Sequence, residues 1–380
     1  MILEKSKNSN NKKDSERFSK DKDSNNNNNG KKQEKSNASF LSSIEITVLD
    51  KSEFLLMQNW DHVKDIMINY LNVSPTTFSD LKVDFSRIRM WSINDKAKFL
   101  TQFINFSKYT TPEFNNLTMN NNKISTNLLN GVKIFKPIVK DEDTIINQLS
   151  LKLVKSGLIN KDIRLKQIFN RFNSDSIIDE PDKRFNFFKN SVLPQLIKKS
   201  SYNNGIMIYI PSYIDYLRIK NYLKDDTSYT FVSIDEYSTQ KELNRNRTLF
   251  VRNSNNAKIL LYTERLHFYK RFDIKGVKNL IFYGLPKDPI FYSEVINFIV
   301  NNKIRIDLKN LKIQQDLMLN GGNDDGEERK EEEEEDPIDL NLCMIRILIS
   351  KFDMINLEKI VGLRIANQLC FGENEMTEFK

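Results

Sequence analysis

The most regular hydrophobic pattern in the chain lies between Lys258 and Val300. Two short apolar runs, at 259–262 and 280–283, each stop at polar or turn residues, and a helical pattern begins near Pro289. Continuous apolar runs of this length are typical of strands buried on both faces, as in a parallel sheet. The stretch therefore predicts strand, loop, strand, turn and helix, with the basic and aromatic segment 265–271 as the loop.

The residues that follow these two strands are the first candidates for a functional site. Thr263-Glu264 ends the first strand and Gly284-Leu285-Pro286 ends the second. In open α/β sheets, ligands bind outside the carboxyl ends of the strands. We therefore expect these two strand ends to face one crevice.

Apolar runs and helical patterns alternate along the rest of the chain, with a polar boundary at 140–147. The predicted strands are 44–49, 87–91, 103–107, 163–169, 206–210, 230–234 and 342–349, with 132–139 extended. The predicted helices are 54–70, 94–101, one starting near Pro112, 184–198, 213–223, 241–251 and 353–369, with a charged connector after Asn301. This alternation predicts parallel α/β sheets with right-handed crossovers, about six strands in the second unit and a shorter first unit.

Composition separates two polar segments from the globular parts. Residues 1–37 are rich in Lys, Asn, Ser and Asp, and the segment 316–338 is strongly acidic. Neither can bury enough apolar surface to fold, so we expect a disordered tail and a disordered acidic insert. The predicted organisation is a first folded unit at 38–140 and a second at 150–380 that carries the insert.

Charge points to an anionic partner. The net charge is +7, although residues 324–336 alone hold ten acidic and two basic side chains, so the rest of the chain is strongly basic. RNA is the first candidate, while the plainer reading is a lysine-rich soluble surface. No apolar run is long enough to span a bilayer, and the charged start predicts no secretory signal. The two cysteines have no disulfide or metal spacing, which favours cytosol or nucleus.

The glycines argue against nucleotide hydrolysis. None of the 11 begins a phosphate-binding pattern of the G-x-x-x-x-G-K-[ST] or G-x-G-x-x-G type, in which backbone N–H groups converge on an anion. The strand-end segment Asp50-Lys51-Ser52-Glu53 carries a lysine where a hydrolase would place an acid beside its magnesium-binding aspartate. Most acids at strand ends are solvated or cap the next helix, and that is the simpler interpretation.

A basic and aromatic cluster follows Thr263-Glu264. Bases can contact phosphates while rings stack on nucleobases or on partner side chains. The alternative is a surface loop whose aromatic rings pack inward. The candidate RNA- or partner-binding residues are Arg265, His267, Tyr269, Lys270, Arg271 and Lys275. His267 alone favours a structural role, and the other histidine, His62, is far away in sequence, so a catalytic histidine or a metal site has little support.

The order of these motifs resembles the second RecA-like domain of DEAD-box RNA helicases, where T-D, R-G-x-D, a strand ending in proline and Y-x-H-R-x-G-R follow one another. This chain has Thr263-Glu264, Arg271-Phe272-Asp273, Pro286 and Tyr292-Ser293-Glu294. Ser293, Glu294 and apolar residues replace the histidine and the arginines of that motif. In the first unit, Asp50-Lys51-Ser52-Glu53 stands in the D-E-A-D position, and 106–109 stands in the S-A-T position.

This degenerate set resembles the digestive organ expansion factor family, also called the U3 small nucleolar RNA-associated protein 25 family. The matching segments run in order from about residue 40 to 370 and include IMIYIPSYIDYLRIKNYL and YTERLHFYKRFDIKGVKNLIFYGLP. The resemblance implies RecA-like domains, the second complete and the first only partial. It further implies a nucleolar, non-enzymatic component of the small-subunit processome in pre-18S ribosomal RNA processing. The implied partners are the U3 ribonucleoprotein, other processome proteins and pre-ribosomal RNA, with no cofactor, metal, membrane or small-molecule substrate.

Two other functional classes stay open at this point. One is an RNA-dependent ATPase or helicase whose missing half comes from another polypeptide. The other is a protein-interaction module with no RNA contact. The degenerate helicase positions that bear on this choice are Asp50, Lys51, Ser52, Glu53, Thr263, Glu264, Ser293 and Glu294.

Overall fold

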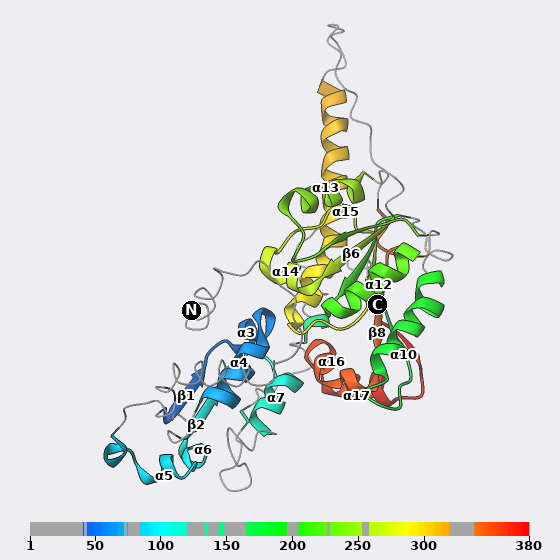
Figure 1. Cartoon of the computed structure of the whole chain (residues 1–380). Coiled ribbons are helices and arrows are strands. Elements are labelled where there is room, and N and C mark those ends of the chain that lie inside the picture. Colours follow the sequence, from blue (N-terminus) through cyan, green and yellow to red (C-terminus); the bar gives the residue numbers. More distant parts are fainter. Residues whose placement is uncertain are drawn as a thin grey trace, which may run out of the picture. The chain divides into compact units, whose positions relative to one another are not determined.

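The chain separates into two compact units, Met1–Lys136 and Pro137–Lys380, and Figure 1 shows their elements. The computed structural model describes residues 41, 44–71, 74, 84–119, 134–135, 144–147, 165–195, 204–225, 229–252, 258–319 and 338–379. The predicted tail at 1–37 and residues 320–337 of the predicted acidic insert lie outside the described residues. The predicted unit boundaries therefore stay a prediction.

The described part of the first unit is built on two parallel strands, β1 (Ile46–Leu49) and β2 (Gln102–Asn105), paired in register from Ile46 opposite Gln102. The helical elements of this unit are α3 (Ser52–Gln58), α4 (Trp60–Asp65), η2 (Ile66–Tyr70), η4 (Phe85–Arg87), α5 (Met90–Ile93), α6 (Ala97–Leu100) and α7 (Pro112–Met119). The strand predicted at 87–91 is wrong: η4 and α5 lie there, because so short an alternating pattern does not separate strand from helical turn. The helix predicted at 54–70 is broken at Asn59, whose backbone is extended.

The second unit contains a seven-stranded sheet in the order β5-β6-β4-β7-β8-β3-β9. All of its pairings are parallel except that of the edge strand β9 with β3. The strands are β3 (Lys166–Arg171), β4 (Ile206–Ile210), β5 (Phe231–Ile234), β6 (Ile259–Thr263), β7 (Asn279–Phe282), β8 (Met344–Ile349) and β9 (Met376–Phe379). The α/β class with parallel sheets is confirmed, although β9 was not predicted.

The helical elements of the second unit are α10 (Glu180–Phe187), η6 (Phe188–Val192), α12 (Tyr213–Asp225), α13 (Gln240–Val251), α14 (Glu264–Lys270), α15 (Pro289–Leu319), η8 (Lys351–Asp353), α16 (Met354–Val361) and α17 (Leu363–Phe371). The helix predicted at 353–369 is interrupted at Gly362, whose positive φ of 86° ends α16. The charged connector predicted after Asn301 is wrong, because α15 continues through it and extends away from the sheet in Figure 1.

The central strands explain the long apolar runs of the sequence. Every residue of β4, β6 and β7 is buried. In β4, Met207 and Tyr209 belong to one apolar cluster, whereas Ile206, Ile208 and Ile210 belong to another. Because successive side chains of a strand point to opposite faces, this division means that helices cover both faces of the sheet.

The loop predicted at 265–271 is instead the short helix α14. Leu266 and His267 are buried, whereas Tyr269, Lys270 and Arg271 are exposed. The segment contains no glycine or proline to break a helix, and its apolar face packs under the polar one. The helix ends at Arg271, which has a left-handed φ of 46°.

Candidate functional site

The carboxyl edge of the second sheet carries the polar residues that the sequence singled out. Thr263 ends β6, Glu264 begins α14 and Gly284-Leu285-Pro286 comes after β7, but β4 pairs with both strands and lies between them. The two strands therefore share a sheet edge without being direct neighbours, although Glu264 still bonds the backbone of the turn after β7. Parallel pairing fixes only the edge, whereas strand order fixes the neighbours.

Glu264 lies in the interior, with 1% of its surface exposed. Its Oε1 accepts a hydrogen bond of 2.8 Å from the backbone N–H of Lys287, which ties the start of α14 to the turn after β7. Burial raises the pKa of Glu264 to about 8, against the opposing effects of the Lys287 charge and backbone donors. A buried carboxyl group that is bonded to the backbone of its own chain is not available to bind a nucleotide or its metal ion.

Thr263 and Arg265 both contact Glu236, in the segment that follows β5. The Thr263 hydroxyl donates to Oε2 of Glu236 at 2.9 Å, and the Arg265 guanidinium lies 3.6 Å from Oε1. Glu236 is almost fully buried, while Arg265 is about one-third exposed. The charge of Arg265 is therefore partly compensated inside the protein, which weakens its case as a contact for a partner.

His267 is 2% exposed and connects three elements. Its Nδ1 lies 3.0 Å from the Tyr262 hydroxyl on β6, and its Nε2 lies 2.8 Å from Oε2 of Glu294 on α15. The rings of Tyr262, Phe291 and Phe298 pack against its imidazole edge to face. Of the six candidate surface residues, His267 alone is fully enclosed, so it does not belong to an exposed surface.

Arg271 completes this arrangement from the outer side. Its guanidinium pairs with the same oxygen of Glu294 and lies 4.4 Å from the centre of the Phe291 ring. Burial alone would raise the pKa of Glu294, but the hydrogen bond with His267 and the charge of Arg271 together hold the pKa below its usual value. Glu294 therefore links α15 to α14 through its contacts with His267 and Arg271. Beside it, the Ser293 hydroxyl donates to the Ile290 carbonyl of its own helix.

Two further candidates are exposed at the end of α14. Tyr269 is 47% exposed, and Lys270 is exposed beside it. Lys275 is exposed as well, but it lines a separate groove described below. The predicted binding residues thus fall into three groups: the exposed end of α14 with Tyr269, Lys270 and Arg271, the partly compensated Arg265, and Lys275 in the groove beside α13.

In the first unit, Asp50-Lys51-Ser52-Glu53 lies between β1 and α3. Lys51 has a left-handed φ of 50°, and Ser52 is fully buried with both its backbone N–H and its hydroxyl bonded to the Phe106 carbonyl. Glu53 is buried and accepts from the Lys108 backbone N–H at 3.4 Å. The segment in the D-E-A-D position is thus hydrogen-bonded to the segment in the S-A-T position. These bonds hold the ends of β1 and β2 together.

Sequence reasoning missed the buried Arg184. It donates to Glu180 at 2.5 Å, to Asp353 at 2.7 Å and to the Tyr283 carbonyl at 2.9 Å. These contacts join α10 to η8 and to the end of β7. Glu180 and Arg184 share a helical spacing of four residues, but Asp353 and Tyr283 come from distant segments, so no sequence pattern reveals the whole cluster.

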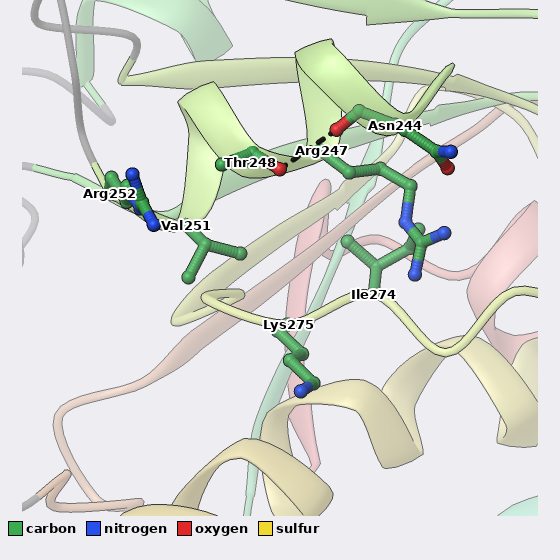
Figure 2. A pocket seen from close by; sticks show the side chains of 7 residues that line it. All are labelled: Asn244, Arg247, Thr248, Val251, Arg252, Ile274 and Lys275. Carbon is green, nitrogen blue, oxygen red and sulfur yellow. Dashed lines mark hydrogen bonds between the residues drawn. The ribbon is translucent and has the colours of Figure 1, made fainter. Parts of the chain in front are cut away.

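Sequence reasoning also missed a basic groove beside α13. Its volume is about 330 Å³, and it is shown in Figure 2. The groove is lined by Asn244, Arg247, Thr248, Val251, Arg252, Ile274 and Lys275. The spacing of the α13 members, three, four, seven and eight residues after Asn244, was the available signal, since such residues share one helix face.

The described residues offer no metal centre and no membrane span. No group of three or more His, Cys, Asp or Glu side chains within them converges as metal ligands would. None of the helices in this part of the chain combines the length and hydrophobicity that crossing a bilayer requires.

Comparison with known proteins gives two family-model matches. The model described as "Utp25, C-terminal domain" matches residues 158–320, and the one described as "UTP25, NTP hydrolase-like domain" matches residues 6–127. The second description supports the RecA-like class predicted for the first unit.

Curated relatives named "U3 small nucleolar RNA-associated protein 25" match almost the whole chain. The protein of Komagataella phaffii is 44% identical over 347 residues, covering 91% of this chain and 44% of the relative. That of Candida albicans is 47% identical over 348 residues, covering 92% and 42%. This chain thus spans less than half the length of these relatives.

Among solved structures, the yeast DEAD-box splicing factor Prp28 is 12% identical, with a TM-score of 0.32 over 87% of this chain and 51% of that one. The RNA helicase Prp28 from Chaetomium thermophilum is 8% identical, with a TM-score of 0.30 over 84% and 52%.

Proposed function

This chain belongs to the U3 small nucleolar RNA-associated protein 25 family, and from that premise we propose that it is a non-catalytic, helicase-like scaffold in pre-ribosomal RNA processing. In this role it acts in the nucleolus, within the small-subunit processome, and contributes to maturation of the 18S ribosomal RNA. Its partners are the proteins of the U3 ribonucleoprotein and pre-ribosomal RNA. The names of the relatives support the association with U3 RNA.

The observation that carries the non-catalytic part is the engagement of Glu294 by His267 and Arg271. By resemblance, this is where a DEAD-box helicase would present arginine toward a nucleotide. Arginine stabilisation of the transferring phosphoryl group contributes several orders of magnitude to hydrolysis. A carboxylate here repels phosphate, and the arginine that pairs with it stabilises the protein's own structure.

The strand-end segments of both units support the same proposal. Glu264 is bonded to the Lys287 backbone, and Glu53 to the Lys108 backbone. A magnesium-dependent hydrolase needs a carboxylate free to bind the ion and another group free to orient water. The family model that matches residues 6–127 carries the description NTP hydrolase-like, which is a statement about fold, and fold alone does not determine activity.

Association with U3 RNA tests the scaffold role directly. The tagged chain should be crosslinked in cells, and the RNA that it retains should be sequenced. Enrichment of U3 RNA and of the leader of pre-ribosomal RNA over an unrelated nucleolar protein is the expected result. Recovery of neither RNA would refute the placement in the processome, whatever the biochemical properties of the purified chain.

The alternative is an RNA-dependent ATPase completed by another polypeptide. It is favoured by the NTP hydrolase-like description and by the share of the relatives that this chain leaves uncovered. Magnesium-dependent ATP hydrolysis by the chain, alone or with the missing segment of a relative added, would support it if Asp50→Ala abolished the activity. Hydrolysis indistinguishable from that of a buffer control supports the scaffold.

The α14 end remains the first surface to test for RNA contact. The triple variant Arg265→Ala, Lys270→Ala and Arg271→Ala should weaken RNA binding if the predicted surface contributes. The partial compensation of Arg265 by Glu236 and of Arg271 by Glu294 means that the effect should come mainly from Lys270. Unchanged affinity and an unchanged salt dependence would remove this surface from consideration.

A further inference from the structure

The groove beside α13 begins next to Arg271-Phe272-Asp273, because Arg247 packs on the Phe272 ring and Ile274 and Lys275 follow that segment. Gly276, which follows its Lys275, packs against Gly205 just ahead of β4: a Cβ on Gly205 would lie 2.4 Å from the Gly276 oxygen. The Lys275 end of the groove is therefore near the amino ends of β4 and β7. None of the degenerate helicase positions lines it.

The two walls of the groove are held firmly. On α13, Leu243 and Phe250 are buried, Asn244 and Thr248 lie on the exposed face, and Arg247 is half-buried between them. Figure 2 shows this face opposite Ile274 and Lys275 of the loop before β7. Ile274 is 1% exposed and anchors that loop in the core.

The loop that carries Lys275 is fixed from α15. Asn302 accepts from the Gly276 backbone N–H at 3.1 Å through Oδ1 and donates to the Val277 carbonyl at 3.3 Å through Nδ2. Gly276 has a φ of +84°, and a Cβ there would come within 3.3 Å of Val251 Cα. The glycine thus lets the loop approach α13 closely, which places Lys275 and Arg252 on the same groove.

The charge of the groove is uncompensated. Across the part of the chain that the structure describes, Arg247, Arg252 and Lys275 have no acidic partner. Asp273, the acid nearest to Lys275 in sequence, is paired with Arg305. Three bases around one hollow with no acid in its lining create a positive potential that favours an anion.

The chemistry of the lining narrows the type of anion. The Arg247 guanidinium lies over the Phe272 ring, 4.5 Å from its centre, and this contact helps to hold the side chain in place. Planar guanidinium groups suit phosphate oxygens and also offer a surface for nucleobases. The Asn244 Oδ1 accepts from Gln240, which leaves its amide hydrogens for another acceptor. A volume of about 330 Å³ is at the lower end of ligand-sized sites, enough for about one nucleotide.

A structural role explains only part of this set. Bases are favoured in the last turn of a helix by its carbonyl groups, and that accounts for Arg252 at the end of α13. It does not account for Arg247, one turn earlier, or for Lys275 on a separate loop. We propose that the groove formed by Asn244, Arg247, Arg252 and Lys275 binds the phosphate backbone of RNA. This proposal rests on the proposed function, since it supplies a direct RNA contact for the scaffold.

The test measures binding of a fluorescent oligouridylate of about twelve nucleotides to the full chain over a range of salt concentrations. The groove variant combines Arg247→Gln, Arg252→Gln and Lys275→Gln. The matched control combines Lys224→Gln, Lys241→Gln and Arg245→Gln, which removes the same charge from exposed bases of α12 and α13 outside the groove. All six changes are at surface positions, and unfolding midpoints in urea check that both variants stay folded.

The groove variant should lose at least about tenfold in affinity, and its salt dependence should weaken by about two logarithmic units per unit of log salt, because single strands contribute about 0.7 per phosphate contact. The control should change affinity by less than about threefold.

Equal losses in both variants would mean that bulk charge alone binds RNA, and no loss in the groove variant would also overturn the proposal. So would unchanged RNA binding combined with loss of binding to a polyglutamate peptide, because the groove would then take an acidic protein segment.

Crosslinking in cells separates this proposal from the family role. If the wild-type chain recovers U3 RNA while the groove variant binds oligouridylate as well as the wild type does, the scaffold stands and the groove does not. If the wild-type chain recovers no U3 RNA but the groove variant loses oligouridylate binding, the groove binds RNA and the processome role fails.

Discussion

At the residue scale, the charged side chains at the strand ends mostly bind one another. Arg184 pairs with Glu180 and Asp353, Glu294 pairs with Arg271, and Glu264 binds a backbone N–H group. Sites that act on nucleotides keep such groups free for the substrate. The residues that carry the family resemblance therefore stabilise the fold in this chain.

Replacing Arg184 should be strongly destabilising. Arg184→Ala leaves two carboxylates near the end of β7 with little solvent access, which costs about 3–5 kcal/mol of unfolding free energy. Urea unfolding followed by circular dichroism measures this. The control is Arg218→Ala, which breaks the more exposed pair with Asp182 and should cost within about 1 kcal/mol. Similar losses for both variants would contradict a central role of the buried cluster.

Glu264 predicts a pH-dependent stability. Its pKa rises from 4.5 in the unfolded chain to about 8 in the folded protein, chiefly through burial. The folded state therefore binds the proton more tightly, so this contribution to stability is complete below pH 4.5 and is lost as the pH rises to 8. Glu264→Gln keeps the shape without the titration. Relative to the wild type, the variant should gain stability between pH 5 and about 8.

Urea midpoints of both proteins, measured across this pH range, decide the question. Parallel curves would show that Glu264 does not change its protonation on folding. Glu242→Gln serves as the control, because the carboxyl group of Glu242 is exposed and its pKa is lowered by the bonds with Thr239, so it should titrate below this range.

At the element scale, the sequence predicted fully buried strands more accurately than partly exposed ones. The prediction for β4, at 206–210, matches the observed bounds, because a central strand buried on both faces is one uninterrupted apolar run. The antiparallel strand β9 alternates exposed and partly buried residues over four positions, too short a pattern to be read. The segment of α14 was taken for a loop because its basic residues were given more weight than its apolar face.

The order of the strands in the sheet also could not be predicted from the sequence. The insertion of β4 between β6 and β7 decides that the two motif-bearing strand ends are not direct neighbours. In the same way, no local pattern brings Glu294 to His267 or Lys275 to Arg247. Such contacts depend on how elements pack after they form, and sequence periodicity carries information only about single elements.

The turn before β4 gives an element-scale prediction. Gly205 has a φ of 71°, and a Cβ there would lie 2.4 Å from the Gly276 carbonyl oxygen. Gly205→Ala should therefore cost at least about 2 kcal/mol, because backbone strain and a clash with rigid backbone add together. Gly276→Ala is the comparison, since its φ is similarly positive but its nearest contact is 3.3 Å away. Thermal unfolding should rank Gly205→Ala as the less stable variant.

At the scale of the whole molecule, the two units differ in how much core the described residues provide. In the first unit, the described apolar cluster has Met67, Leu71 and Leu117 as its buried members. Ile46 and Val48 of its sheet are 60% and 51% exposed. Each apolar cluster of the second unit is far larger. An apolar sheet face in water contributes little to stability and invites association.

Limited proteolysis should therefore digest the first unit before the second. A protected fragment that begins between residues 137 and 165 and retains α17 is expected in mass spectrometry, since segment 150–380 is proposed to fold by itself. A fragment expressed from Pro137 should show cooperative unfolding in urea. Protection of 38–140 together with rapid loss of the second unit would reverse this ranking.

The position of β3 has a consequence for synthesis on the ribosome. β3 is the first of the described strands of the second unit to be made, yet its two neighbours in the sheet are β8 and β9, which lie near the end of the sequence. The segments between them, β4 to β7, can pair with one another as they emerge. β3 must wait with both of its edges unpaired until β8 has left the exit tunnel, and its second edge stays unpaired until Phe379 has left as well. The period in which this chain most needs protection from aggregation is therefore set by the time taken to translate the rest of the unit.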